Sequence, residues 1–179
     1  MARAFVAVVP PRAVLDAVGA LPRPEVPRAR WSRREQWHVT LQFLGDDADL
    51  DGVAGALAGL RGDRVRVRLG GAGGFPSAQR GRVLWLGVCE GSAGLVAVAG
   101  AVGERLDAVG YPPDPRPYRP HLTLARFQPP ADLRAALAGL GDVVVGPAWV
   151  VDEVVLVESG RGSGGRSEYL ERGQFGLEA

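Results

Sequence analysis

The chain has 179 residues, 46% of them hydrophobic, a formal net charge of +1, and 21 basic residues that are all arginine. This length suits one domain, or two small lobes that share a core, and the small net charge gives no general attraction to polyanions. The longest apolar runs are too short to span a membrane, and the single cysteine excludes internal disulfides and a cysteine-based metal cage. A cytoplasmic protein is therefore predicted.

Strand patterns, which are short and rich in Val and Leu, occur at residues 5–9, 37–44, 65–69, 83–88, 121–127, 143–145, 150–157 and 168–170. Helix patterns lie between them at residues 12–21, 50–60, 93–109 and 131–140. Asp49 and Pro130 are start signals for the second and fourth helices. The glycine-rich segment 160–165 lacks the lysine of a Walker motif, so we expect a hairpin connection there, whose Arg161 or neighbouring Arg166 is available to phosphate.

The order of these elements repeats along the chain. The word LDAVG occurs before both H-x-T-L strands (residues 15–19 and 106–110), ADL follows at 48–50 and 131–133, and ALAGL at 56–60 and 136–140. A valine-rich strand follows each ALAGL and is the fourth match in the same order. The four matches indicate a duplicated β-α-β-α-β unit. We expect a single bilobal domain over residues 1–179, with sequence halves of roughly 1–80 and 81–179.

The two repeated strands hold the only histidines and the only threonines of the chain. WHVTLQFLGD contains His38 and Thr40, and PHLTLARF contains His121 and Thr123. A histidine on one such strand is commonly an ordinary hydrogen-bonded residue, and threonine is a good strand former. Two threonines placed at random, however, would fall two residues after both histidines only about once in 15,000 arrangements. The pairing therefore indicates function.

Strand alternation assigns the side chains of each motif to two faces. In the first motif one face should carry His38, Thr40 and Gln42, and the other Val39, Leu41 and Phe43. In the second motif one face should carry His121, Thr123 and Ala125, and the other Leu122 and Leu124. If a pseudo-two-fold axis relates the lobes, the two polar faces meet in one site.

Such a site suits proton transfer at a phosphate. Two imidazoles titrate near neutrality, so one can accept a proton while the other donates one. Two hydroxyls can donate hydrogen bonds to phosphate oxygens. Two histidines without a third are a poor zinc site, and the chain has no G-x-S-x-G nucleophile motif. We therefore predict neither a metal nor another cofactor.

A group of arginines precedes the first motif, comprising Arg28, Arg30, Arg33 and Arg34. Guanidinium groups suit phosphate because they present a rigid fork of donors. A solvated basic surface in a chain that uses arginine throughout explains the group equally well.

The duplicated motif with its flanking strands resembles the 2H phosphoesterase superfamily. More narrowly, the chain is similar to RNA 2',3'-cyclic phosphodiesterases, formerly called 2'-5' RNA ligases. The likeness runs from RAFVAVVPP through GRVLWLGV to VDEVVLVES and SEYLERGQFGL. It implies an α+β fold of two pseudo-symmetric lobes, each an antiparallel sheet backed by helices, with a central groove.

The resemblance also implies metal-independent hydrolysis of an RNA terminal 2',3'-cyclic phosphate to a 2'-phosphate. His121 and His38 would be the base and the acid, and Thr40 and Thr123 would bind phosphate. Arg126 matches an arginine that contacts substrate in the family, although strict alternation turns it away from His121 unless a bulge intervenes.

Phe75 matches an aromatic region where the family stacks a base, and an ordinary core phenylalanine explains it equally well. Two alternatives remain: a different 2H phosphodiesterase acting on ADP-ribose cyclic phosphate or on 2'-5' oligonucleotides, and a non-catalytic module that binds RNA ends. The expected partners are RNA ends or cyclic-phosphate nucleotides, without a membrane. Because no long apolar stripe stands out, we expect a monomer.

Overall fold

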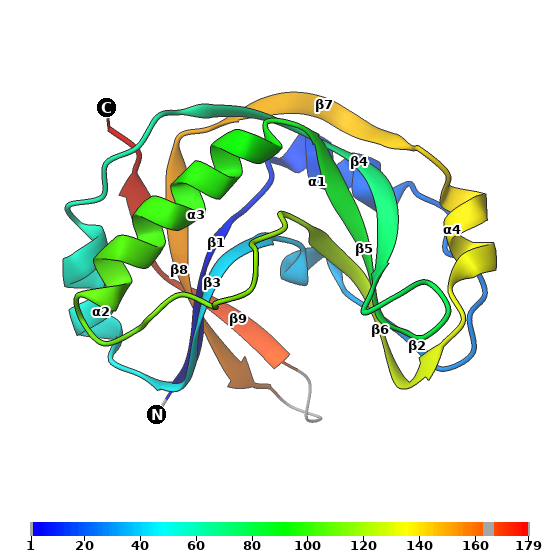
Figure 1. The fold of residues 1–179 in the computed structure, drawn as a ribbon, viewed down its shortest axis with the longest axis horizontal. Helices are drawn as coiled ribbons and strands as arrows, with labels where there is room; N and C mark the ends of the chain where they lie inside the picture. The colour runs from blue at the N-terminus through cyan, green and yellow to red at the C-terminus, as the bar shows by residue number, and fades with distance from the viewer. Residues whose placement is uncertain (1, 163–166, 179) are drawn as a thin grey trace.

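Two ten-residue strands with matching burial patterns, β3 (Val39–Ala48) and β6 (Leu122–Ala131), lie at the centre of the sheet. The computed structural model describes residues 2–162 and 167–178, and in that part nine strands form one antiparallel sheet ordered β7-β4-β5-β6-β3-β1-β8-β9, with β2 paired to β6. Only one residue pair, Val39 with Leu122, joins β3 to β6. The sheet therefore consists of two halves that meet at this pair, one with the four strands β3, β1, β8 and β9 and one with the five strands β7, β4, β5, β6 and β2. It curls into the arch of Figure 1.

The other elements follow the predicted order, with one additional strand, β2. They are β1 (Ala2–Val8), α1 (Arg12–Gly19), β2 (Ala29–Trp31), the 3-10 turn η1 (Arg34–Gln36), α2 (Leu50–Leu57), β4 (Val65–Phe75), β5 (Gly81–Glu90), α3 (Ser92–Asp107), α4 (Arg134–Leu140), β7 (Val144–Val151), β8 (Glu153–Arg161) and β9 (Ser167–Gly176). The predicted α+β class, with antiparallel half-sheets backed by helices, is confirmed.

Each half-sheet takes strands from distant parts of the chain. β4 joins β5, β6 and β7, whereas β8 and β9 join β1 and β3. The helices also pack on elements from distant parts of the chain. α1 packs on β7, α3 packs on β3 and α2, and α4 packs on β4 (Figure 1). No described helix is long and apolar enough to cross a membrane.

The two faces of the sheet differ in what covers them. One face packs against the helices in the main hydrophobic core, where Val39 and Leu122 are fully buried. The opposite face, which we call the open face, carries a smaller cluster in which Tyr169 packs against Phe5, Ala7, Val155 and Val157. Alternation along β1 separates the two clusters, because Ala4, Val6 and Val8 belong to the main core.

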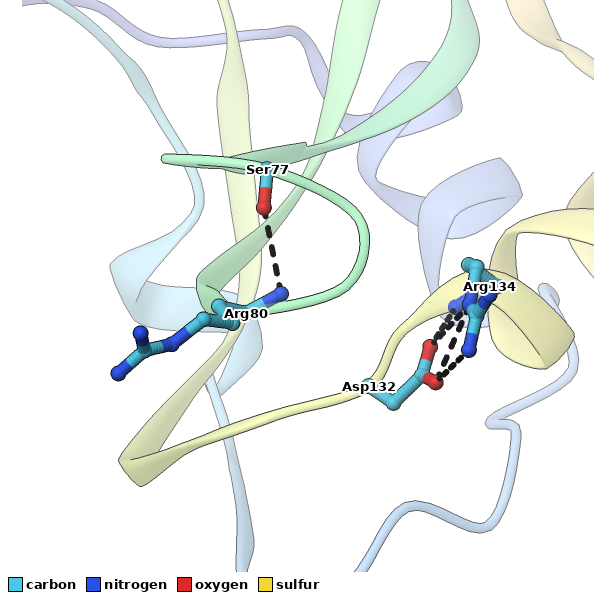
Figure 2. Close-up of polar contacts among 4 residues, drawn as sticks. All are labelled: Ser77, Arg80, Asp132 and Arg134. Carbon is cyan, nitrogen blue, oxygen red and sulfur yellow. Dashed lines mark hydrogen bonds and ion pairs between the residues drawn. The ribbon is translucent and has the colours of Figure 1, made fainter.

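Two predicted boundaries are wrong. The pattern at 150–157 is not one strand, because β7 ends at Val151 and β8 begins at Glu153. The fourth helix begins at Arg134 instead of residue 131, and Pro130 lies within β6. Asp132 fixes the later start, since its carboxylate accepts a 3.0 Å hydrogen bond from the Arg134 backbone N–H and pairs with the guanidinium (Figure 2).

The start of α4 also holds the loop that follows β4. The Leu133 N–H donates to the Ala78 carbonyl at 2.7 Å. Within the same loop the Ser77 hydroxyl accepts a 3.2 Å bond from the Arg80 backbone N–H (Figure 2). Phe75, the last residue of β4, is therefore anchored from the side of α4.

Two other signals are confirmed. The Asp49 carboxylate accepts a 3.1 Å bond from the Gly52 N–H at the start of α2. β8 and β9 pair from Glu153–Gly176 to Arg161–Ser167, which is the predicted hairpin. Residues 163–166 of its connection, including Arg166, lie outside the described part of the chain.

Candidate active site

A β-bulge interrupts both motif strands at the same position. Ala7 pairs with Thr40 and Val6 with Gln42, so Leu41 has no partner on β1. Trp85 pairs with Thr123 and Leu84 with Ala125, so Leu124 has no partner on β5. An extra residue in one strand reverses the alternation beyond it.

Because of the bulges, three side chains lie on the opposite face of the sheet from the one predicted. The bulge in β6 is also the irregularity that Arg126 needs in order to share a face with His121. Gln42 and Ala125, expected beside the histidines, are instead buried on the helix side, where the Gln42 amide donates to the Tyr111 carbonyl at 2.8 Å. Phe43, expected in the core, is 57% exposed and its ring lies 5.9 Å from that of Phe5 on the open face. By the same shift, Arg126 turns onto the face of His121.

The two histidines and two threonines surround the pair that joins the half-sheets. His38 and Thr40 flank Val39, while His121 and Thr123 flank Leu122. Because Val39 and Leu122 point into the core, all four polar side chains point to the open face. The electrostatic influence of His121 on the pKa of His38 agrees with the closeness of the rings.

The backbone fixes the tautomer of both rings. The Nδ1 atom of His38 lies 2.7 Å from the Gln36 carbonyl oxygen, and that of His121 lies 2.7 Å from the Arg119 carbonyl oxygen. A carbonyl can only accept, so Nδ1 carries the proton and Nε2 is the free acceptor in the neutral ring. On His38 this Nε2 lies 2.9 Å from the Thr40 hydroxyl, which donates to it.

Aromatic rings hold each imidazole. His38 stacks on Phe5 with centroids 4.5 Å apart and meets the edge of Tyr169 at 5.5 Å. His121 meets Phe75 edge-on at 5.0 Å and Trp85 at 6.2 Å. Phe75 is thus placed beside the second histidine and outside both hydrophobic clusters of the described residues.

The same surroundings shift the histidine pKa values. Burial lowers the pKa of His38 to about 4, opposed by its bond to the Gln36 carbonyl and assisted by the charge of Arg126. Burial also lowers the pKa of His121, again opposed by a backbone carbonyl and assisted by Arg126. Arg126 influences the pKa of both imidazoles and of the Tyr169 phenol, which agrees with its place on the open face after the bulge.

Four side chains that contact the motifs were missed from the sequence, among them Trp85 beside His121. Phe5 and Tyr169 support His38, and Tyr118 crosses from the segment before His121 to donate a 2.8 Å bond to the Thr40 carbonyl. Phe5 and Tyr169 lie in strands without any motif, so no sequence signal marked them. Tyr118 stands three residues before His121, and only its folded position connects it to the first motif.

One cavity among the described residues lies away from the histidines. It measures about 640 Å³ and is lined by Asp63, Arg64, Leu177 and Glu178, without an imidazole. A smaller cavity, about 380 Å³, adjoins the second motif and includes Trp85, Tyr118 and Arg119 in its walls. The smaller cavity is the one next to the histidines, because Arg119 and Pro120 directly precede His121 and Trp85 contacts its ring. Among the described residues no three His, Cys, Asp or Glu side chains are grouped to hold a metal.

Comparison with known proteins places the chain among related sequences. The model of the 2'-5' RNA ligase superfamily matches residues 10–163. A protein of Aeropyrum pernix named RNA 2',3'-cyclic phosphodiesterase is 36% identical over 121 residues, which are 65% of this chain and 69% of that protein.

Two solved structures share the fold. A Thermus thermophilus protein matches with a TM-score of 0.75 and 29% identity, covering 98% of this chain and 97% of that one. E. coli LigT complexed with 3'-AMP matches with a TM-score of 0.74 and 24% identity over 98% of both chains.

Proposed function

The chain belongs to the 2'-5' RNA ligase superfamily, and we propose that it hydrolyses the terminal 2',3'-cyclic phosphate of RNA to a 2'-phosphate. Family membership and the named relatives agree with the predicted phosphodiesterase class. The finer proposal concerns how this chain's own residues carry out the reaction.

One observation supports the proposal most strongly. Two imidazoles with the same tautomer and two threonine hydroxyls surround a single residue pair on one open face. A module that only binds phosphate has no need of two titratable rings, each held with Nδ1 on a backbone carbonyl and Nε2 turned to the open face. Proton transfer in both directions does need them.

The proposed reaction is an in-line attack by water on phosphorus. The water oxygen forms a bond to phosphorus while the bond from phosphorus to the ribose O3' breaks. One Nε2 takes the proton of the water, and the Nε2–H of the other ring gives a proton to O3'. The product carries a 2'-phosphomonoester and a 3'-hydroxyl, and both rings return to their starting states after exchanging protons with solvent.

His121 suits the role of base, and His38 that of acid. Among the described residues, the Nε2 of His121 has no hydrogen-bond partner, so its lone pair is available to water. The Nε2 of His38 is engaged by Thr40 until a phosphate draws the hydroxyl away. The negative charge of a bound phosphate also offsets the charge of Arg126. The phosphate therefore raises the pKa of His38 and favours the protonated ring that can donate to O3'.

Thr40, Thr123 and Arg126 are the proposed phosphate ligands. The hydroxyls donate neutral hydrogen bonds, and the guanidinium donates charge-assisted ones to the same non-bridging oxygens. Phe75, beside His121, is proposed to stack the terminal base. Both motifs come from one chain, so we propose that a monomer is sufficient.

Product analysis on a short RNA ending in a 2',3'-cyclic phosphate tests the proposal. We expect consumption of the cyclic end and a 2'-phosphomonoester as the only product, with no added metal. A 3'-phosphomonoester would contradict the choice of bond, and an intact cyclic end would contradict the activity. The same assay with a cyclic phosphate of ADP-ribose and with a 2'-5' linked dinucleotide separates the two alternative substrates.

A further inference from the structure

β2 breaks the symmetry of the molecule. This three-residue strand, Ala29–Trp31, pairs with the last three residues of the second motif on β6, beyond the bulge. The corresponding segment before β6, residues 111–121, forms no strand. The half-sheet of β6 therefore carries additional residues at the edge of the site that the half-sheet of β3 lacks.

The register of β2 places one arginine beside another. Arg30 lies directly opposite Arg126, while Ala29 and Trp31 lie opposite Phe127 and Ala125. Ala29 and Trp31 pack against the main core, so Arg30 points the other way, to the open face. Side chains directly opposite each other on an antiparallel pair share a face and are neighbours.

Within the described part of the chain, neither arginine of this pair forms an ion pair. The six ion pairs among the described residues connect other arginines to carboxylates. Like charges placed directly opposite on neighbouring strands weaken a sheet. Two adjacent, exposed guanidinium groups at the edge of a phosphate site therefore require an anion from outside the chain.

The two arginines differ in distance from the chemistry. Arg126 influences both imidazoles, whereas Arg30 lies on the neighbouring strand, about 4.8 Å to the side, and is not among the groups that influence either ring. Arg126 thus suits the reacting phosphate, and Arg30 suits the next negative charge along a bound nucleic acid.

We propose that Arg30 binds the phosphodiester that precedes the cyclic end, so that the preferred substrate is an RNA chain and not a cyclic mononucleotide. The inference rests on the proposed function and specifies the substrate class of that same site. A cyclic mononucleotide contains no second phosphate and makes no use of Arg30. An RNA chain uses both guanidinium groups.

Two variants and two substrates test this proposal. The variant Arg30→Gln is compared with Arg64→Gln, an exposed arginine before β4 that lines the distant cavity. We expect Arg30→Gln to lower kcat/KM about tenfold on a tetranucleotide ending in a 2',3'-cyclic phosphate and to change it less than about twofold on a cyclic mononucleotide. Arg64→Gln, with the same loss of charge, should leave both values unchanged.

Binding measurements keep the inference separate from the activity. The affinity for a tetranucleotide ending in a 2'-phosphate is measured against salt concentration for the wild type and both variants. Loss of one phosphate contact should reduce the slope of log K against log salt by about 0.7 in Arg30→Gln alone. Equal losses on both substrates, or an unchanged slope, would overturn the role of Arg30. Absence of turnover by the wild type would overturn the proposed function and leave the binding result to decide on Arg30.

Discussion

The two motif strands on the open face have the same backbone irregularity but carry different side chains beyond it. Each has a bulge at the leucine that follows the threonine, and each fixes its imidazole through Nδ1. After the bulge, however, the first motif presents Phe43 to the open face and the second presents Arg126. The two motifs therefore contribute matching imidazoles, and under the proposed mechanism the different side chains beyond the bulges make the site directional.

The contacts around the two imidazole rings also differ between the motifs. His38 is stacked on Phe5, bonded to Thr40 and strongly lowered in pKa, whereas His121 has its Nε2 free among the described residues. His38 is therefore in the more closed environment, although burial lowers the pKa of both rings and Arg126 influences both. The proposed division of the acid and base roles rests on this difference.

The largest expected effect comes from removing either ring. His38→Ala and His121→Ala should each lower kcat by about 10²–10⁴-fold, because each ring transfers one proton in the same step. Steady-state kinetics on a cyclic-phosphate RNA measures this, with circular dichroism as the check that both variants fold. Should one variant keep most of its activity, the two halves would not be equivalent in chemistry.

The difference in pKa between the halves should appear in stability. The folded state resists protonation of His38, so stability falls as pH drops from 6.5 to about 4, by roughly 3 kcal/mol. Urea unfolding across this range should show that loss in the wild type and a smaller one in His38→Gln. His121→Gln is the matched control and should retain most of the wild-type dependence. Identical pH dependence in the wild type and His38→Gln would contradict the closed environment.

Replacing Arg126 should affect both halves at once. Arg126→Gln should lower kcat/KM by about 10–100-fold through loss of a charge-assisted contact. It should also raise the pKa of both histidines, because the guanidinium now lowers them. The pH profile of kcat/KM would then move to higher pH. A lower rate with an unmoved profile would indicate that the guanidinium lies away from the rings.

The smallest expected effect concerns the hydrogen bond from Tyr118, in the segment before the second motif, to Thr40 in the first motif. Tyr118→Phe removes the hydrogen bond to the Thr40 carbonyl and should cost about 1 kcal/mol of stability and a few-fold in kcat. Tyr111→Phe is the control, since its hydroxyl accepts from the Asp49 N–H at the start of α2, away from the motif. Equal losses of kcat in the two variants would argue against a special role for Tyr118.

The sequence was sufficient where a local pattern determines the structure. Counting the histidines and threonines identified four side chains that the structure brings together, and hydrophobic periodicity located the described helices and all described strands except β2. The three residues of β2 are too few to show a period, and a bulge leaves no mark in the residues that form it. Alternation therefore misplaced Gln42, Phe43 and Ala125, and it made Arg126 conditional on an irregularity that only the register reveals.

Long-range contacts were beyond a sequence-based prediction for a different reason. Phe5 and Tyr169 meet His38 because β1 pairs with β3 and β9 reaches β1 through β8, and Trp85 meets His121 because β5 pairs with β6. This exchange of strands between the ends of the chain depends on the packing of the whole sheet. No residue type at a fixed spacing announces it.

Because the chain has only two histidines, an imidazole NMR titration follows both of them without interference. The measurement is repeated with a saturating ribonucleoside 2'-monophosphate, and single His→Gln variants assign the signals. If both rings contact one phosphate, the pKa of His38 and that of His121 should rise together on binding, from their lowered values in the free protein. A rise at one ring while the other stays unchanged would contradict convergence of the two halves on a single phosphorus.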